Sequence, residues 1–319
     1  MSSAFACAPA PAPIHNLNLQ RYYSDAKGIR IDTAKRRELR AAVAPLKSFM
    51  VETAQQTDAV WRGSEPDVAR AKCVLAWLEA WARADALLGK MSTKQAKYER
   101  NWALSGLALS YLKVRPFVPV TQHEVISRWL LKLANLNRAF LNESGRKRNN
   151  HRYWLGLGLG AVGLATDDER AWSDARAIMA EAAQSITANG TLPLELARGK
   201  RAVHYHNFAA QPLFVLIALA RARGEDWSAL NDGAFGRLVG FLADALCAPR
   251  SVPELQVLPA QVPVNPRDFQ AGWINDYVAR GGKVDACLEG IPREKRATNY
   301  HRLGGDFGQL SKALAAKRF

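Results

Sequence analysis

The sequence has few cysteines and no long apolar run. Its 319 residues include four cysteines, Cys7, Cys73, Cys247 and Cys287, and none is spaced from another as zinc ligands are. No run of about 18 apolar residues occurs, which excludes a transmembrane helix. Four cysteines allow three disulfide pairings. Pairing in sequence order would join Cys7 to Cys73 and Cys247 to Cys287 and would suit an oxidising compartment, whereas four buried thiols would suit a cytosolic protein.

Acidic residues are also scarce relative to basic ones. The chain has 44 Lys and Arg against 29 Asp and Glu, a formal net charge of +15. A surplus of this size favours a polyanionic partner, namely nucleic acid, an anionic membrane or an acidic polysaccharide, although a merely basic soluble surface has the same composition. Because 48% of the residues are hydrophobic, the chain can bury a core and is not disordered.

Strand alternation is missing, and the spacing of apolar residues is helical almost throughout. We therefore predict an all-α fold, as a bundle, a solenoid or an α/α barrel. No fixed-period repeat supports a solenoid, and no linker divides the chain. We predict an extended segment over residues 1–20, rich in proline, and one domain over 21–319. A capping box is expected from Thr121 to Glu124. The predicted helices span 35–57, 64–88, 94–113, 121–141, 154–165, 168–187, 201–223, 232–247, 267–280 and 305–317, with an irregular segment at 253–266.

One familiar motif occurs in the wrong context. Gly158, Gly160 and Gly163 match the G-x-G-x-x-G fingerprint of dinucleotide-binding folds. That fingerprint requires a preceding strand within a βαβ unit, whereas here the glycines continue a helix. We interpret them as sites of close helix packing. No H-E-x-x-H, G-x-S-x-G or Walker motif is present. No paired carboxylates stand out in a polar cluster either, so a glycoside hydrolase is poorly supported.

Two short polar segments carry most of the candidate chemistry. The first spans 146–154 and the second 198–206, and together they combine amide, imidazole, phenol and guanidinium groups. A single histidine beside aromatic residues is more often structural than catalytic. Several proton-transfer and anion-binding groups in two clusters favour a site between the segments, and the surrounding cations would bind carboxylates or phosphates equally well. The candidate groups are Asn150, His151, Arg198, His204 and Tyr205.

A basic segment lies near the N-terminus. Residues 22–40 carry six lysines and arginines, which would form either a lid over an anionic substrate or a solvated helix face. Residues 1–14 lack the basic and apolar regions of a signal peptide. The cations are Lys27, Arg30, Lys35, Arg36, Arg37 and Arg40.

Four motifs resemble those of the alginate lyase family, the poly(β-D-mannuronate) lyases. They read Asn-Asn-His-x-Tyr-Trp at 149–154, Leu-Pro-x-Glu-Leu-x-Arg-Gly-x-Arg-Ala-x-x-Tyr-His at 192–206, Arg-x-Tyr-x-Asp-Ala-x-Gly at 21–28 and His-Arg-Leu-Gly-Gly-Asp at 301–306. The resemblance implies an incomplete (α/α) toroid with a deep cleft, no metal, no cofactor, and a periplasmic location with the signal peptide removed. It also implies that Asn150, His151, Arg198 and Tyr205 are catalytic. The strong positive charge departs from the family pattern and would suit a broader polyuronate lyase.

Further residues near these motifs are candidates for binding the polymer. Each of them could equally serve packing or surface charge. The expected partner is an anionic polysaccharide. No nucleic acid or membrane partner is expected, and the protein is expected to be a monomer. The substrate-binding candidates are Tyr22, Tyr23, Arg152, Tyr153, Trp154, Arg201, His204 and Arg302.

The implied reaction sets definite chemical requirements. A uronate lyase removes the weakly acidic C5 proton and expels the C4 oxygen, so the carboxylate charge must be neutralised. Asn150, Arg198 and a protonated or donating His151 suit that task. Tyr205 would shuttle the proton, with an adjacent cation favouring its phenolate. One residue can act as base and acid only where H5 and O4 share a face. This predicts activity on polymannuronate, and beyond it on polyglucuronate or hyaluronan. Polyguluronate, for which His151 is the candidate base, should be a poor substrate.

Two other classes of protein compete with a lyase. A basic helical protein that binds nucleic acid would explain the charge, but no helix has a basic recognition face and no nucleic-acid-binding motif is present. A polysaccharide-binding protein without catalysis would keep affinity for the polymer and form no product.

Overall fold

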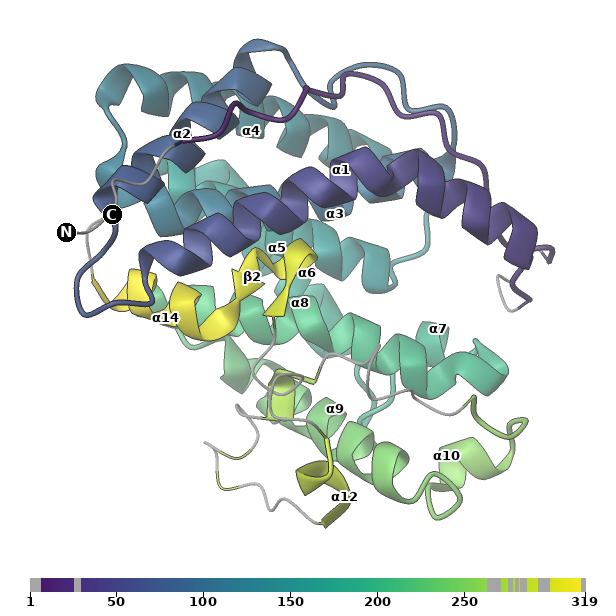
Figure 1. Ribbon diagram of the computed structural model, residues 1–319. Coiled ribbons are helices and arrows are strands. Elements are labelled where there is room, and N and C mark those ends of the chain that lie inside the picture. Colours follow the sequence, from purple (N-terminus) through teal and green to yellow (C-terminus); the bar gives the residue numbers. More distant parts are fainter. Residues whose placement is uncertain are drawn as a thin grey trace.

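The computed structural model describes residues 7–25, 30–262, 271–274, 278, 281, 286–291 and 299–316. Helices dominate these residues. Four long helices contact one another in sequence order: α1 (Thr33–Val60), α3 (Lys94–Val114), α5 (Asn150–Thr166) and α8 (Ala202–Ala222). Each packs against the long helix that follows it: α2 (Val68–Arg83), α4 (Val120–Asn142), α6 (Glu169–Ser185) and α9 (Leu230–Cys247). These pairs, arranged around α3 and α5 in Figure 1, form an incomplete (α/α) toroid, as predicted.

Short elements connect the pairs and complete the C-terminal part. Two residues each form strands β1 (Asn299–Tyr300) and β2 (Gly305–Asp306), which pair antiparallel. The last helix, α14 (Phe307–Ala315), contacts α3 and α8, so the C-terminal segment returns to the centre of the molecule. The other short helices are η1 (Arg115–Phe117), α7 (Pro193–Leu196), η2 (Gly199–Arg201), η3 (Trp227–Ala229), α10 (Pro253–Gln256), α12 (Ala286–Glu289) and η4 (His301–Leu303).

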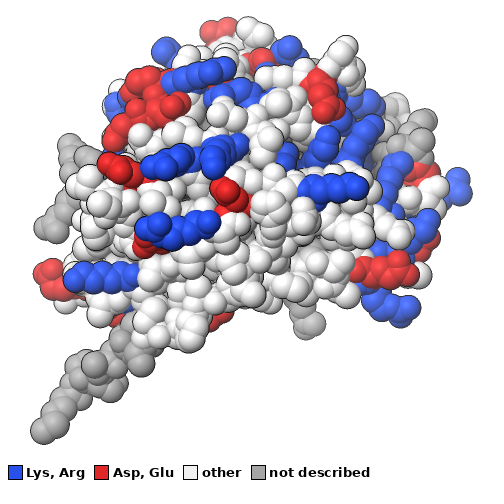
Figure 2. Space-filling model, turned by 90° about the horizontal axis from the view of Figure 1, so that it is seen from above, with Lys and Arg blue, Asp and Glu red and all other residues white. Residues whose placement is uncertain are grey.

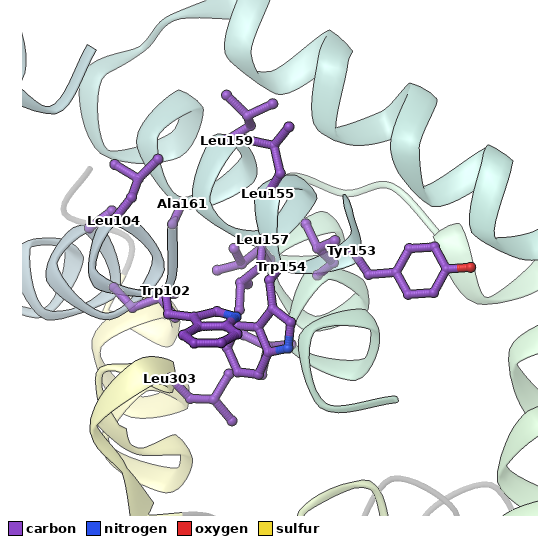
Figure 3. Packing of buried hydrophobic residues seen from close by; sticks show 14 of the residues in the cluster. Trp102, Leu104, Tyr153, Trp154, Leu155, Leu157, Leu159, Ala161 and Leu303 are labelled. Carbon is purple, nitrogen blue, oxygen red and sulfur yellow. The ribbon is translucent and has the colours of Figure 1, made fainter. Parts of the chain in front are cut away.

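The glycines of α5 allow its neighbours to approach closely. A Cβ atom added to Gly160 would lie 2.7 Å from Leu216 of α8, and one added to Gly163 would lie 2.7 Å from the backbone of Trp172 in α6. Such distances leave no space for a side chain. The G-x-G-x-x-G sequence is therefore a helix-packing motif, as predicted. Figure 3 shows the leucines of the same helix packed among the surrounding helices.

Two details of the prediction are wrong. The expected capping box fails because α4 begins at Val120, one residue early, and its N-cap residue Pro119 makes no side-chain hydrogen bond to the helix. The segment at 253–266 is not irregular throughout, because Pro253 occupies the first turn of α10, where its missing N–H costs nothing. The helix predicted over 267–280 falls largely outside the described residues.

The N-terminal segment runs extended against the toroid. Within 7–20 it forms no helix, and Leu17 pairs with Met91 in an isolated bridge. The indole of Trp77 donates to the carbonyl of Ala8 over 2.8 Å. Disulfides join Cys7 to Cys73 and Cys247 to Cys287, which is the pairing in sequence order. Over the described part of the chain, no helix combines the length and apolar character needed to span a bilayer.

Candidate active site

The N-terminus of α5 holds an asparagine against a buried glutamate. Asn150 is the first residue of the helix and is fully buried. Its backbone N–H donates to Oε1 of Glu195 over 2.8 Å, and its Nδ2 lies 3.0 Å from each carboxylate oxygen. Glu195 is 1% exposed, and burial raises the pKa of its carboxyl although Asn150 stabilises the charged form. The Oδ1 atom of Asn150 has no hydrogen-bond partner among the described residues.

His151 follows on the same helical turn and stacks on an aromatic ring. Its ring centre lies 3.6 Å from that of Tyr98, with an interplanar angle of 7°. Burial, followed by the charges of Arg198 and Arg302, lowers the pKa of His151 to about 3. The imidazole is therefore neutral near pH 7, contrary to the protonated alternative. Its Nδ1 atom is buried and has no hydrogen-bond partner within the described part of the chain.

Residues from two distant parts of the sequence meet at Tyr205. The guanidinium carbon of Arg198 lies 3.6 Å from the centre of the Tyr205 ring. The hydroxyl of Tyr205 lies 2.6 Å from that of Tyr23, which itself accepts a hydrogen bond from Tyr22 over 3.0 Å. Tyr205 begins the buried face of α8, and Tyr23 comes from the loop before α1. The two segments meet at the end of the molecule where α7 lies in Figure 1.

The surroundings of Tyr205 act on its proton in opposite directions. Burial raises the pKa of the phenol most, and the neighbouring Tyr23 raises it further. Arg198 lowers the pKa, but the net shift is upward. Arg198 favours the phenolate, as expected, but burial and Tyr23 outweigh it, so Tyr205 is a neutral phenol in the covered site. Tyr205 is only 8% exposed, and its hydroxyl is in contact with that of Tyr23.

The C-terminal segment adds a cation to this region. The guanidinium carbon of Arg302 lies 3.8 Å from the centre of the Trp102 ring, and its Nη2 atom lies 3.1 Å from Oε2 of Glu99. Its charge lowers the pKa of both His151 and Tyr22. Two further candidates surround Tyr205. The guanidinium carbon of Arg201 lies 5.4 Å from the Tyr205 ring, and the exposed His204 contacts that ring edge-on.

Three proposed substrate-binding residues are misplaced in the prediction. Trp154 is completely buried and Tyr153 is 3% exposed, so neither side chain presents a surface to a polymer. Figure 3 shows Trp154 beside Trp102 and Leu303 while Tyr153 points away from them. Arg152 is turned to α6, where it pairs with Glu181 over 2.6 Å. Arg152 and Tyr153 face other directions than His151, because successive residues of a helix are turned by about 100°. Trp154 is one turn further and lies on the same face as His151, but it is completely buried.

The other arginines of the 146–154 segment also form ion pairs. Arg148 lies 2.8 Å from Glu181, and Arg146 pairs with Glu143. Acidic side chains thus offset part of the positive charge expected at the site. Elsewhere the basic surplus remains visible: in Figure 2, lysines and arginines gather toward the right-hand side, the side on which α1 begins in Figure 1. Within the described ranges, no three His, Cys, Asp or Glu side chains are grouped to hold a metal ion.

Sequence reasoning missed residues that orient the site. Glu195 stands inside the 192–206 motif, but its role depends on a contact with Asn150, 45 residues away. A glutamate among apolar residues at the start of a short helix was the only available signal. Tyr98, Glu99 and Trp102 lie on α3, which is buried on all sides from Glu99 to Val114, so its sequence pattern gave no reason to single them out.

A helical toroid that collects an asparagine, a neutral histidine, arginines and a buried tyrosine defines the class of helical polysaccharide lyases. Residues 16–252 match the alginate lyase family, and the chain belongs to this family. A "polysaccharide lyase" from Stenotrophomonas maltophilia (strain K279a) is 38% identical over 314 residues, covering 96% of this chain and 91% of that protein. An "alginate lyase" from Azotobacter vinelandii (strain DJ / ATCC BAA-1303) is 33% identical over 251 residues, covering 75% of this chain and 66% of that protein.

Solved structures show the same fold. A His-to-Ala variant of alginate lyase A1-III complexed with tetrasaccharide superimposes with a TM-score of 0.80, covering 95% of this chain and 85% of that one at 23% identity. Alginate lyase A1-III from Sphingomonas species A1 gives a TM-score of 0.76 at the same identity, covering 95% of this chain and 86% of that one. At this identity the likeness concerns the fold alone.

Proposed function

We propose that the protein cleaves 1,4-linked polyuronates by β-elimination, with polymannuronate as the main substrate. Membership of the alginate lyase family supports the reaction class. The observation that carries the residue roles is the meeting of Arg198 and Tyr205 beside the N-terminus of α5. A neutral proton carrier, a cation and a helix N-terminus are the groups that removal of a proton next to a carboxylate requires.

The N-terminus of α5 is proposed to hold the uronate carboxylate. Helix N-termini attract anions through the helix dipole. The backbone N–H groups of Asn150 and His151 already bond to Glu195 and Asn149, so the side chains would bind the carboxylate. The Nδ2 group of Asn150 lies 3.0 Å from both oxygens of Glu195, so the substrate would share it with that glutamate, and a neutral His151 can donate one N–H. With Arg198 and Arg302 nearby, these donors would stabilise the enolate-like charge that develops as H5 leaves.

Tyr205 is proposed to move the proton. Substrate entry displaces Tyr23, which removes a neighbour that raises the pKa of Tyr205 and leaves Arg198 to favour the phenolate. The phenol proton is lost to solvent before the first turnover. The phenolate then takes H5, and the C5–H electrons form the C4–C5 double bond as the C4–O4 bond breaks. The regenerated phenol returns the proton to O4. The polymer is thereby cut without water, and Tyr205 ends as the phenolate that began the cycle.

The remaining assignments follow from the same site. Tyr22, Tyr23, Arg201, His204 and Arg302 are proposed to contact the polymer, and residues 22–40 to include the cover over Tyr205. Polyglucuronate and hyaluronan, which share the C4 and C5 geometry of mannuronate, are the proposed wider substrates. The two disulfides support a periplasmic location, where they would persist. We propose that the protein acts there as a monomer.

The deciding experiment is an absorbance assay. The folded protein is mixed with polymannuronate, and the near-ultraviolet absorbance of the new conjugated double bond is followed. We expect a steady rise. Absence of a rise with polymannuronate, polyglucuronate and polyguluronate would reject a lyase. Retained binding to these polymers would then identify a polysaccharide-binding protein, and tight binding to nucleic acid at physiological salt would support the other alternative.

A further inference from the structure

A completely buried ion pair lies beneath the C-terminal segment. Lys113 of α3 and Asp58 of α1 bond to each other, with side-chain exposures of 0% and 1%. Burying two charges costs free energy that their attraction rarely recovers, and well-packed apolar residues often serve stability equally well. Stabilisation of the contact between α1 and α3 therefore does not by itself explain the pair.

The other hydrogen bonds of this pair go to the backbone of two C-terminal residues. Nζ of Lys113 donates to the carbonyls of Gly304 and Asp306, over 2.7 and 3.2 Å, in addition to Asp58. These bonds use all three ammonium hydrogens. The second oxygen of Asp58 accepts from the N–H of Asp306 over 2.9 Å. An apolar pair of equal volume could not make these contacts, so the ion pair is a binding site for the 304–306 backbone.

Glycines bring the segment close enough to make the bonds. A Cβ atom on Gly305 would lie 2.4 Å from Oδ2 of Asp58, and one on Gly106 of α3 would lie 2.3 Å from the carbonyl of His301. Gly304 and Gly305 also have φ angles of +70° and +99°, which side chains disfavour. The backbone path from His301 to Asp306 is therefore set by contact with α1 and α3.

This path ends in the candidate active site. Arg302 lies two residues before Gly304 and stacks on Trp102 of α3, and Glu99 on the next turn accepts its hydrogen bond. The ion pair binds the same segment near the other end of α3, about 20 Å away by the helical rise between Glu99 and Lys113. The segment thus runs along α3 with one end fixed at a buried charge pair and the other presenting a cation to His151.

We propose that Asp58 and Lys113 are positioning residues that set the register of the C-terminal segment and so place Arg302 in the active site. The proposal rests on the lyase function for its effect on turnover. The pair touches no reacting group and acts through the backbone of 304–306. Its removal should misplace Arg302 while the toroid remains folded.

The test uses the paired substitution Asp58→Leu/Lys113→Met, because either single change leaves an unpaired buried charge and prevents folding. We expect kcat/KM on polymannuronate to fall at least tenfold, with helicity unchanged. In an Arg302→Ala background, the paired substitution should change kcat/KM less than twofold. Lys312→Met is the matched control, because Lys312 donates nearby to the carbonyl of Trp61 and not to the segment. It should stay within twofold of the unaltered protein.

Gly305→Ala disturbs the same contact from the side of the C-terminal segment. It is the second variant to use if the paired substitution prevents folding. It should reproduce the tenfold loss. An equal loss of kcat/KM with and without Arg302 would overturn the proposal, because it would indicate a general disturbance of the fold. Hydrogen exchange of the 299–306 amides, measured without substrate, should accelerate at least tenfold in both variants. Unchanged exchange overturns the positioning role whatever the activity, whereas an inactive unaltered protein with accelerated exchange in the variants rejects only the lyase.

Discussion

Arg198 lies face to face with Tyr205, its guanidinium carbon 3.6 Å from the ring centre, while the Tyr205 hydroxyl is 2.6 Å from that of Tyr23. One neighbour favours the phenolate and the other opposes it. Tyr23 therefore helps to keep Tyr205 protonated in the free site. Arg198 is already in place to stabilise the Tyr205 phenolate once Tyr23 has moved. This relationship leads to the first prediction.

Replacing Tyr205 by phenylalanine should abolish turnover and preserve binding. The substitution removes the oxygen that carries the proton but keeps the ring over Arg198. We expect kcat to fall on the order of 10³-fold, measured by the absorbance assay, with polymannuronate affinity changed less than threefold by equilibrium binding. Tyr153→Phe, which removes a buried phenol on α5, is the control. Equal loss of binding and turnover in Tyr205→Phe would argue against proton transfer.

Glu195→Gln should reduce turnover through Asn150. The glutamate accepts from both the backbone and the side chain of Asn150, and hydrogen bonds to a charged group contribute roughly 1.5–3 kcal/mol. A loosened amide should lower kcat about 10- to 100-fold with little change in KM. Glu181→Gln serves as the control, since Glu181 pairs with arginines away from Tyr205. The role assigned to Glu195 is wrong if both variants have the same activity.

The stability of the protein should fall as pH decreases from 6.5 toward 4.5, partly because of His206. Its Nε2 accepts from Leu192 and its Nδ1 lies 2.8 Å from the carbonyl of Ala202, and burial lowers its pKa to about 4. In this window the unfolded chain binds a proton that the folded chain excludes. The free energy of unfolding therefore decreases as the pH decreases, by up to about 1.4 kcal/mol per pH unit for this residue.

The measurement is a series of thermal melts across that pH range. His206→Gln cannot titrate, so its melting temperature should depend less steeply on pH than that of the unaltered protein. His15→Gln removes an exposed histidine and provides the matched control. Parallel curves for His206→Gln and the unaltered protein would contradict the prediction.

The disulfide between Cys7 and Cys73 should stabilise the folded chain by restricting the unfolded one. It closes a loop with a sequence separation of 66, for which chain entropy predicts about 4 kcal/mol. Cys7→Ser/Cys73→Ser should therefore lower the free energy of unfolding by roughly that amount, measured by denaturant titration. Cys247→Ser/Cys287→Ser offers a comparison with the shorter separation of 40. No change in the first variant would show that the N-terminal segment is held by packing alone.

Polymannuronate should be cleaved at least tenfold faster than polyguluronate. A single tyrosine can remove H5 and protonate O4 only when both lie on the same face of the ring, which holds for mannuronate and not for guluronate. Initial rates of absorbance increase on the two polymers provide the comparison. A faster rate on polyguluronate would place the base on the opposite side, and the neutral His151 would then be tested by His151→Ala.

The sequence alone determined the helical class, because apolar residues at helical spacing must be buried on one face whatever their partners are. It also identified the glycines of α5 as packing residues, since no strand precedes them. The resemblance of local motifs to those of the family proposed Asn150, His151, Arg198 and Tyr205 as catalytic residues, which stays a prediction. Helical spacing and local motifs depend only on residues that are close together in the sequence, so they can be recognised before the fold is known.

Only the tertiary structure decided which side chains share a site. It removed Tyr153, Trp154 and Arg152 from the surface facing Tyr205, because helical geometry turns Arg152 and Tyr153 in other directions and Trp154 is completely buried. It added Glu195, whose effect depends on Asn150 in another helix. It also reversed the expected shift in the pKa of Tyr205, because burial and Tyr23 outweigh Arg198. Burial and contacts between distant segments exist only once the chain is folded.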